Sequence, residues 1–391
     1  MATLMSNYAR LPVTFTKGEG ALLWDTEGRM YLDALSGIAV CNLGHAHPNV
    51  TTAICEQAQT LVHTSNIYGI EQQRRLADKL TALTGMENSF FCNSGAEANE
   101  AMIKLARLYA RRKNIPNPAI IVADSSFHGR TLATLSATGN PKVQQGFEPL
   151  VPDFIHVPYN DVAAIEQLAQ TQQNIVAVMV EPVQGEGGVN IPANDYLNQL
   201  RALCDQQQWL LMLDEIQTGI GRTGQWVAYQ HNHILPDVVS LAKGLGNGVP
   251  IGACLARGIA AELFSPGTHG TTFGGNPLAC RTALAVLDTI EQDNLLQRVN
   301  ELSSHFETGF ETQLSDIQGI QSIRVKGLMI GIELDQPCTE LVQLALAQHL
   351  LINVTAGNTI RLLPPFILTD SQADKIILTV SGLIKSFLAM H

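Results

Sequence analysis

Short apolar runs rich in β-branched residues recur between residues 118 and 256. Stretches with helical periodicity separate them, and residues 161–173 and 194–208 are two of these. Strands that alternate with helices are typical of a mostly parallel sheet with helices on both faces. The expected strands are residues 119–123, 154–158, 174–182, 209–215, 237–243 and 250–256. The pattern predicts an α/β fold with its active site at the carboxyl ends of the strands.

The two ends of the chain follow different patterns. In the first 45 residues, glycine-containing turns separate short strand-like pieces. After Pro277, helical periodicity over residues 278–314 is followed by short strands and by a closing helix from Asp370 onward. We therefore expect residues 46–277 to form a large domain, and residues 1–45 and 278–391 to form a smaller α+β domain together.

Composition narrows the class of protein. Of 391 residues, 46% are hydrophobic and 15% are charged, against roughly 25% charged in an average protein, which favours a buried homo-oligomer interface. The net charge of −11 argues against a nucleic-acid partner. No apolar run approaches a membrane span or a signal peptide, and the seven cysteines include no C-x-x-C pair. These features predict a soluble, cytoplasmic protein with no membrane partner and no disulfides.

A candidate phosphate site lies in the segment NSGAEANE. Ser94 and Glu97 have the spacing of a capping box, so a helix should begin at this point. The backbone N–H groups of Gly95 and Ala96 would then be free at its positive end, where phosphates bind readily. The alternative is an ordinary helix start without a ligand.

A carboxylate and a lysine follow two of the expected strands. Asp214 ends the run WLLMLD, where a carboxylate could keep the ring nitrogen of pyridoxal phosphate protonated. Lys243 follows DVVSLA and precedes several glycines, and a buried lysine of this kind can serve as an imine partner and a proton carrier. Lys326 in RVKGLM has a similar local pattern, so the pairing with Asp214 is what favours Lys243.

Seven blocks of sequence carry a family resemblance. They occur in the family's order, span nearly the whole chain and resemble class III aminotransferases of fold type I, which use pyridoxal 5′-phosphate. The blocks are NSGAEANE (93–100), SFHGRT (126–131), EPVQGEGG (181–188), LDEIQTGIGRTG (213–224), LAKGLGNGVPIGA (241–253), GTTFGGNP (270–277) and RLLPP (361–365).

The resemblance implies roles around the cofactor. Lys243 would be the Schiff-base lysine, and Asp214 would pair with the pyridinium nitrogen. Thr272 would reach the phosphate of the neighbouring subunit, so a homodimer would share its active sites. The other implied cofactor contacts are Gly95 and Ala96 at the phosphate, Phe127 on the ring face, Glu215 and Ile216 beside Asp214, and Gln217 at the ring hydroxyl.

The resemblance also implies how substrates bind. Arg130 and Arg361 would hold substrate carboxylates, because a guanidinium meets a carboxylate with two parallel hydrogen bonds. Glu186 would act as a switch: by pairing with Arg361, it would let one pocket accept first a distal amine and then the α-carboxylate of glutamate. Thr271 is a further candidate for contact with substrate.

Within the family, the choice of amino donor depends on Ile38. Ornithine-type members tend to carry an aromatic residue at this position, whereas Ile38 and the N-terminal NYARLPV resemble the acetylornithine aminotransferases. The expected reaction moves the δ-amino group of N2-acetyl-L-ornithine to 2-oxoglutarate, giving N-acetyl-L-glutamate 5-semialdehyde and L-glutamate, a step of arginine biosynthesis. Ornithine, succinylornithine, N-succinyl-diaminopimelate and 4-aminobutyrate remain alternative donors.

Three alternative functions from other protein classes fit the sequence less well. Gly219, Gly221 and Gly224 form G-x-G-x-x-G, but too far beyond the strand for a dinucleotide-binding turn. Ser240 and Lys243 have S-x-x-K spacing, but the other motifs of that hydrolase class are missing. A cofactor-free binding protein on the same fold is the third. The histidines of GHAHP lack further ligands nearby, so we expect no metal.

Overall fold

The computed structural model describes residues 3–390. Its central sheet contains β4 (Asn88–Cys92), β5 (Ala119–Ala123), β6 (Phe154–Val157), β7 (Ile175–Val180), β8 (Leu210–Asp214), β9 (Val238–Leu241) and β10 (Gly252–Ala256). Their order is β4-β10-β9-β8-β7-β5-β6. Neighbours from β9 to β6 are parallel, whereas β10 is antiparallel to both β9 and β4. β4 therefore runs in the same direction as the parallel strands.

Alternate residues of the central strands are buried on opposite faces of the sheet. Ile120 and Met212 join a core with α4 (Gly95–Arg112), whereas Ile121 and Leu211 join a second core with α8 (Tyr196–Gln207). Because helices cover both faces, the strands are nearly continuous apolar runs. Further helices of this part are α2 (Pro48–Thr60), α3 (Glu71–Thr84), α5 (Leu132–Ala137), α6 (Pro141–Gln144), α7 (Val162–Thr171) and the 3-10 helices η1 (Ala228–Asn232), η2 (Lys243–Leu245) and η3 (Gly258–Glu262).

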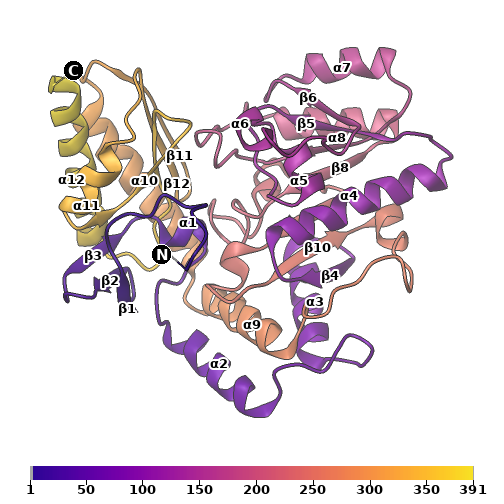
Figure 1. The fold of residues 1–391 in the computed structure, drawn as a ribbon, viewed down its shortest axis with the longest axis horizontal. Helices are drawn as coiled ribbons and strands as arrows, with labels where there is room; N and C mark the ends of the chain where they lie inside the picture. The colour runs from indigo at the N-terminus through magenta and orange to yellow at the C-terminus, as the bar shows by residue number, and fades with distance from the viewer. Residues whose placement is uncertain (1–2, 391) are drawn as a thin grey trace.

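Two four-stranded sheets lie beside the central sheet, on the left of Figure 1. The first orders β1 (Phe15–Glu19), β2 (Leu22–Asp25), β3 (Met30–Asp33) and β13 (Leu350–Leu351), so it joins segments from both ends of the chain. The second orders β11 (Ile320–Lys326), β12 (Met329–Leu334), β15 (Thr359–Leu362) and β14 (Asn353–Thr355). The accompanying helices are α1 (Ser36–Ala39), α10 (Leu295–Leu314), α11 (Leu341–Ala347) and α12 (Asp370–Met390). The helix before them, α9 (Pro277–Gln292), packs against α2 and α3 beside the central sheet.

The α/β class and all six expected strands are confirmed, with ends that differ by a few residues at most. The structure adds β4 and reverses β10, neither of which the apolar runs predicted. The helical pattern after Pro277 is two helices, because Asn294 has a left-handed backbone (φ 52°) that interrupts it. Within residues 3–390, no helix is long and apolar enough to cross a membrane. The domain division at residues 45 and 277 stays a prediction.

A buried arginine ties the central sheet to the C-terminal sheet. Arg222 is fully buried and follows β8 in the loop that contains the G-x-G-x-x-G glycines. Its guanidinium donates to the carbonyl oxygens of Pro364 (2.6 Å) and Leu328 (3.2 Å) and to the side chain of Asn42. It also lies 4.8 Å over the Phe366 ring. Burial lowers its pKa to about 9. These neutral oxygens compensate part of the cost of burying the charge.

Replacing this cation should destabilise the fold strongly. Arg222→Met leaves three buried oxygens without their donor, so the free energy of unfolding should fall by about 3 kcal/mol. Denaturant unfolding followed by circular dichroism measures this change. The control is Arg107→Met at an exposed position, which should change stability by less than about 0.5 kcal/mol. Equal effects of the two substitutions would contradict the bridging role.

Candidate active site

Parallel strands bring several polar residues to one edge of the central sheet. Asp214 ends β8, Glu181 directly follows β7, and Lys243 follows β9 by two residues. Because β4 runs in the same direction, the start of α4 lies at this edge too. A cavity of about 390 Å³ opens here. The candidate residues that line it are Gly95, Ala96, Phe127, Arg130, Glu186, Asp214, Ile216, Gln217 and Lys243.

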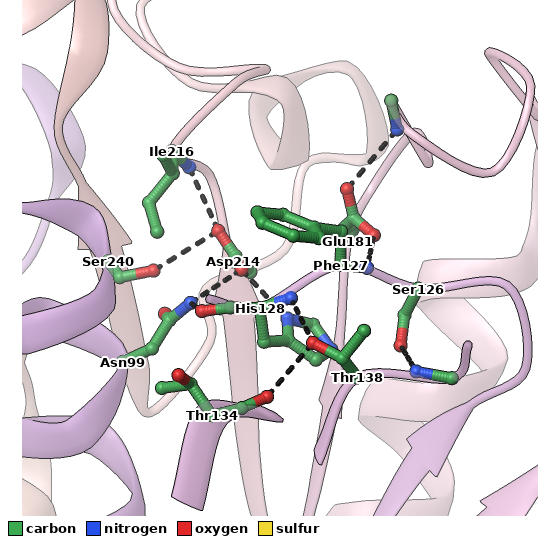
Figure 2. A network of polar contacts seen from close by, with 12 residues as sticks. Asn99, Ser126, Phe127, His128, Thr134, Thr138, Glu181, Asp214, Ile216 and Ser240 are labelled. Carbon is green, nitrogen blue, oxygen red and sulfur yellow. Dashed lines mark hydrogen bonds and ion pairs between the residues drawn. The ribbon is translucent and has the colours of Figure 1, made fainter. Parts of the chain in front are cut away.

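Asp214 is the most fully hydrogen-bonded side chain of the cavity (Figure 2). Its Oδ2 accepts from Asn99 Nδ2 (2.7 Å) and lies 2.8 Å from His128 Nδ1. Its Oδ1 accepts from the Ile216 N–H (3.1 Å) and the Ser240 hydroxyl (3.4 Å). Only 3% of Asp214 is exposed. These bonds hold the carboxylate in place where it meets the cavity.

His128 and Asn99 are site residues that the sequence reasoning missed. His128 is buried, and although burial lowers its pKa, the hydrogen bond to Asp214 outweighs burial and raises the pKa. The backbone of His128 is fixed as well, because its N–H donates to Thr138 Oγ1 (2.9 Å) and its carbonyl accepts from Asn99 Nδ2 (2.7 Å). The hydrogen bond from His128 compensates part of the cost of burying the Asp214 carboxylate.

Lys243 reaches the cavity from a left-handed backbone position, with φ 42°. It is half-buried. Burial lowers the pKa of its amine, and Arg361 lowers it further, whereas Glu186 and Asp214 act in the opposite direction. A lowered pKa makes more of the free amine available as a nucleophile and base.

The start of α4 forms as the sequence predicts. Ser94 Oγ accepts from the Glu97 N–H (3.2 Å), and Glu97 Oε2 accepts from the Asn93 N–H (2.6 Å). Within residues 3–390, the N–H groups of Gly95 and Ala96 have no partner and line the cavity. A side chain at Gly95 would collide with that of Ile216, so only glycine lets the backbone approach this closely.

Arg361 of the C-terminal sheet pairs with Glu186, which lies in the loop after β7. Arg361 is fully buried on β15, and its Nη1 donates to Glu186 Oε1 (2.7 Å) and more weakly to Gln217 Oε1 (3.4 Å). Burial raises the pKa of Glu186, but the interactions with Arg361 outweigh it and the pKa is lowered. Arg361 Nη2 has no partner in the described chain. This buried donor is free to bind an acceptor from a ligand.

Some predicted residues lie outside the cavity. The Glu215 side chain points away and accepts from the Thr218 hydroxyl and the Tyr229 N–H, so no cofactor contact through this side chain is supported. Thr271 Oγ1 accepts from Asn93 Nδ2 (3.2 Å) just beside the cavity. Thr272 is exposed. Ile38 does not line the cavity in this chain, although Val40, two residues on, does.

The histidines of GHAHP have other contacts. His45 Nε2 pairs with Asp33 Oδ2 at 2.8 Å, and this hydrogen bond raises the His45 pKa to about 9. Burial lowers the pKa of His47. Over residues 3–390, no three His, Cys, Asp or Glu side chains gather as metal ligands would.

Glu181 is a second carboxyl that the sequence reasoning missed. Its Oε1 accepts from the Phe127 N–H (3.0 Å) and its Oε2 from the Gly185 N–H (3.2 Å), so it links the loop after β5 to the loop that carries Glu186. Burial raises its pKa to about 7, although the charge of His128 acts to lower it. The sequence signal was available: Glu181 ends an apolar strand, as Asp214 does.

Comparison with known proteins places the chain in a family. The model of the family described as aminotransferase class III matches residues 3–384. The chain belongs to the class III aminotransferases, enzymes that depend on pyridoxal phosphate.

Its relatives match over nearly the whole chain. The acetylornithine aminotransferase of Nitrosomonas europaea is 56% identical over 388 residues, which cover 99% of both chains. Among solved structures, the acetylornithine aminotransferase of Elizabethkingia anophelis has a TM-score of 0.88 at 38% identity and covers 98% of this chain and 96% of its own. The ornithine aminotransferase of Toxoplasma gondii has a TM-score of 0.96 at 34% identity and covers 100% and 94%.

The Glu181 carboxyl should make stability depend on pH. Its pKa of about 7 lies above the ordinary 4.5, so the folded chain keeps a proton that the unfolded chain releases. Holding this proton stabilises the folded chain fully below pH 4.5. The stabilisation is lost as the pH rises to about 7, by at most about 1.4 kcal/mol per pH unit. Glu181→Gln, which cannot titrate, should flatten the pH dependence of the free energy of unfolding in cofactor-free enzyme.

Denaturant titrations at pH 5, 6, 7 and 8 measure this slope. The exposed Glu307→Gln is the matched control and should retain the slope of the unmodified chain. If Glu181→Gln retained it too, the raised pKa would be refuted.

Proposed function

We propose that the enzyme transfers the δ-amino group of N2-acetyl-L-ornithine to 2-oxoglutarate. The names of its full-length relatives support this donor. The observation that carries the proposal is the convergence of Lys243, Asp214 and Glu186, the partner of the buried Arg361, on one cavity. The products are N-acetyl-L-glutamate 5-semialdehyde and L-glutamate, which fits arginine biosynthesis.

The residues of the cavity fit pyridoxal phosphate. When bound, the cofactor supplies an electron sink for negative charge at the substrate carbon. The free N–H groups of Gly95 and Ala96 would hold its phosphate, and Phe127 would flank its ring. Asp214, fixed by its four hydrogen bonds, would hold the proton on the ring nitrogen. Gln217 donates to the ring hydroxyl.

Lys243 is the residue that moves protons. Its lowered pKa lets the amine bind the cofactor covalently in the resting enzyme and act as a base once the donor has replaced it. The freed amine would then accept the proton that leaves the substrate carbon and carry it within the site. In the second half-reaction, the same steps run in reverse on 2-oxoglutarate.

Glu186 and Arg361 allow one site to serve two substrates. Glu186 pairs with Arg361 in the structure. In this arrangement the charge of Arg361 is neutralised, so that the uncharged part of the donor could lie beside it. When 2-oxoglutarate binds, Glu186 moves aside and Arg361 meets the α-carboxylate with two parallel hydrogen bonds, one of them from the unpartnered Nη2. Arg130, which lies 5.7 Å from the Phe127 ring, holds the other carboxylate.

An exposed apolar surface supports a homodimer. Leu61, Val62, Ile67, Tyr68 and Phe273 are large hydrophobic side chains that are 46–80% exposed. The segment from Leu61 to Tyr68 lies beside the one that carries Phe273, because Asn66 Nδ2 donates to the carbonyl oxygens of Thr271 (3.3 Å) and Gly274 (2.9 Å). Exposed apolar surface of this kind marks an interface. A second copy on this surface would bring Thr272, and with it Thr271, close to a neighbouring active site in a cytoplasmic dimer.

Removing the Lys243 amine should abolish turnover without abolishing cofactor binding. Lys243→Ala should reduce kcat by at least about 10⁴-fold, because both the covalent partner and the proton carrier are lost. Noncovalent contacts should still retain part of the pyridoxal phosphate through gel filtration, as measured by visible absorbance. The exposed Lys375→Ala should keep full activity and an absorbance that changes with donor and returns with 2-oxoglutarate. Full turnover by Lys243→Ala would refute the assignment.

The donor assignment is tested by kcat/KM for acetylornithine, ornithine, succinylornithine and 4-aminobutyrate. Val40, which lines the cavity, offers no polar partner to a free α-ammonium group, so acetylornithine should be preferred over ornithine by about 100-fold. A preference for free ornithine would overturn the donor assignment, while the transaminase chemistry would stand.

A further inference from the structure

Two basic residues outside the active site meet at a second cavity. Lys326, the last residue of β11, and His231 of η1 both line a space of about 310 Å³. Lys326 comes from the C-terminal sheet, whereas His231 belongs to the part built around the central sheet. A volume near 300 Å³ is at the small end of ligand-binding pockets.

Lys326 has no counter-ion in the described chain. Its side chain is half-buried, and within residues 3–390 it forms neither a hydrogen bond nor an ion pair. Burial lowers its pKa, and no acidic group opposes that effect. No carboxylate lines the cavity. An ammonium group that is partly desolvated and unpaired favours an anion from solution.

The second basic group can become a donor to the same anion. His231 Nε2 lies 3.0 Å from the Thr223 carbonyl oxygen, which can only accept, so the proton of the neutral ring is on Nε2. Within residues 3–390, Nδ1 has no hydrogen-bond partner, and it becomes a donor once the ring is protonated. The charged groups that face His231 are Lys326 and His233, both basic. Burial lowers the His231 pKa and the two basic neighbours lower it further, so a bound anion would raise it.

The rest of the cavity is mostly apolar, with Pro182, Val183, Ile191, Pro192 and Leu197 among its lining residues. We propose that this cavity binds a small carboxylate with a short aliphatic body, whose carboxylate lies between Lys326 and His231 and whose body packs on the prolines. The site is separate from the catalytic cavity. It bridges the two parts of the chain in the same region as Arg222, because Gly327 packs directly on the backbone of Arg222 and Thr223.

The two cavities share one loop. Pro182 and Val183 line the second cavity, whereas Glu181 and Glu186 of the same loop line the first. A carboxylate in the second cavity would therefore contact the segment that positions Glu186. This shared loop gives the ligand a physical connection to the site where Glu186 pairs with Arg361.

The test uses holoenzyme and 4,4,4-trifluorobutyrate, whose binding is followed by broadening of its ¹⁹F resonance. The catalytic cavity can also bind carboxylates. Binding at the second site is therefore measured as the difference between the titrations of the unmodified enzyme and of the Lys326 variants. Lys326→Gln should weaken binding at the second site on the order of tenfold or more, because one charge-assisted hydrogen bond is lost. Lys326→Arg and the exposed Lys375→Gln should retain it. Trifluorobutylamine, of opposite charge, should not bind at the second site.

The pH dependence gives an independent readout. Binding at the second site should strengthen as the pH falls from 8 to 5.5, and His231→Gln should remove this dependence while its amide still donates to Thr223. Turnover of Lys326→Gln without trifluorobutyrate should equal that of the unmodified enzyme, which verifies its fold. Identical trifluorobutyrate titrations for the unmodified enzyme and Lys326→Gln would overturn the proposal.

Discussion

The direction of the central strands is the constraint on which the site depends. Each parallel strand delivers the residue after its carboxyl end to the same edge, so residues far apart in the sequence meet there without long loops. Asp214, Glu181 and Lys243 follow three adjacent strands. The reversed β10 contributes from its other end, because Pro250 and Ile251, which precede it, line the same cavity. One edge of the central sheet therefore brings these residues to a single cavity, whereas Arg361, which pairs with Glu186 of that cavity, comes from β15 of the C-terminal sheet.

Buried charge is the cost of this arrangement, and the structure offsets it locally. Asp214 lies beneath the cavity with four hydrogen-bond partners, one of which is the raised-pKa His128. Arg361 donates to Glu186 through Nη1, whereas its Nη2 has no hydrogen-bond partner in the described chain. Complete compensation at Asp214 suits a fixed partner of a cofactor, whereas incomplete compensation at Arg361 suits a group that exchanges partners during turnover.

The sequence predicted the fold class and the strands because buried parallel strands are apolar runs, a local property. It predicted Asp214 and Lys243 because they follow such runs. It missed His128 and Asn99, because their contacts with Asp214 form only when the folded sheet brings distant segments of the chain together. It placed Glu215 with its neighbours at the cofactor because the local pattern does not say which side a side chain faces.

Lys243 and Lys326 show why local pattern alone cannot assign a role. Each lies at or just beyond the end of a strand, precedes a glycine and has a pKa that burial lowers. They differ in what surrounds them. Lys243 faces three carboxyl groups and an arginine at the edge where the parallel strands end, which suits the chemical role proposed for its amine. Lys326 faces prolines and a histidine with no acid in reach, so its amine can only attract an anion. The difference between a nucleophile and an anion-binding group is made by tertiary structure.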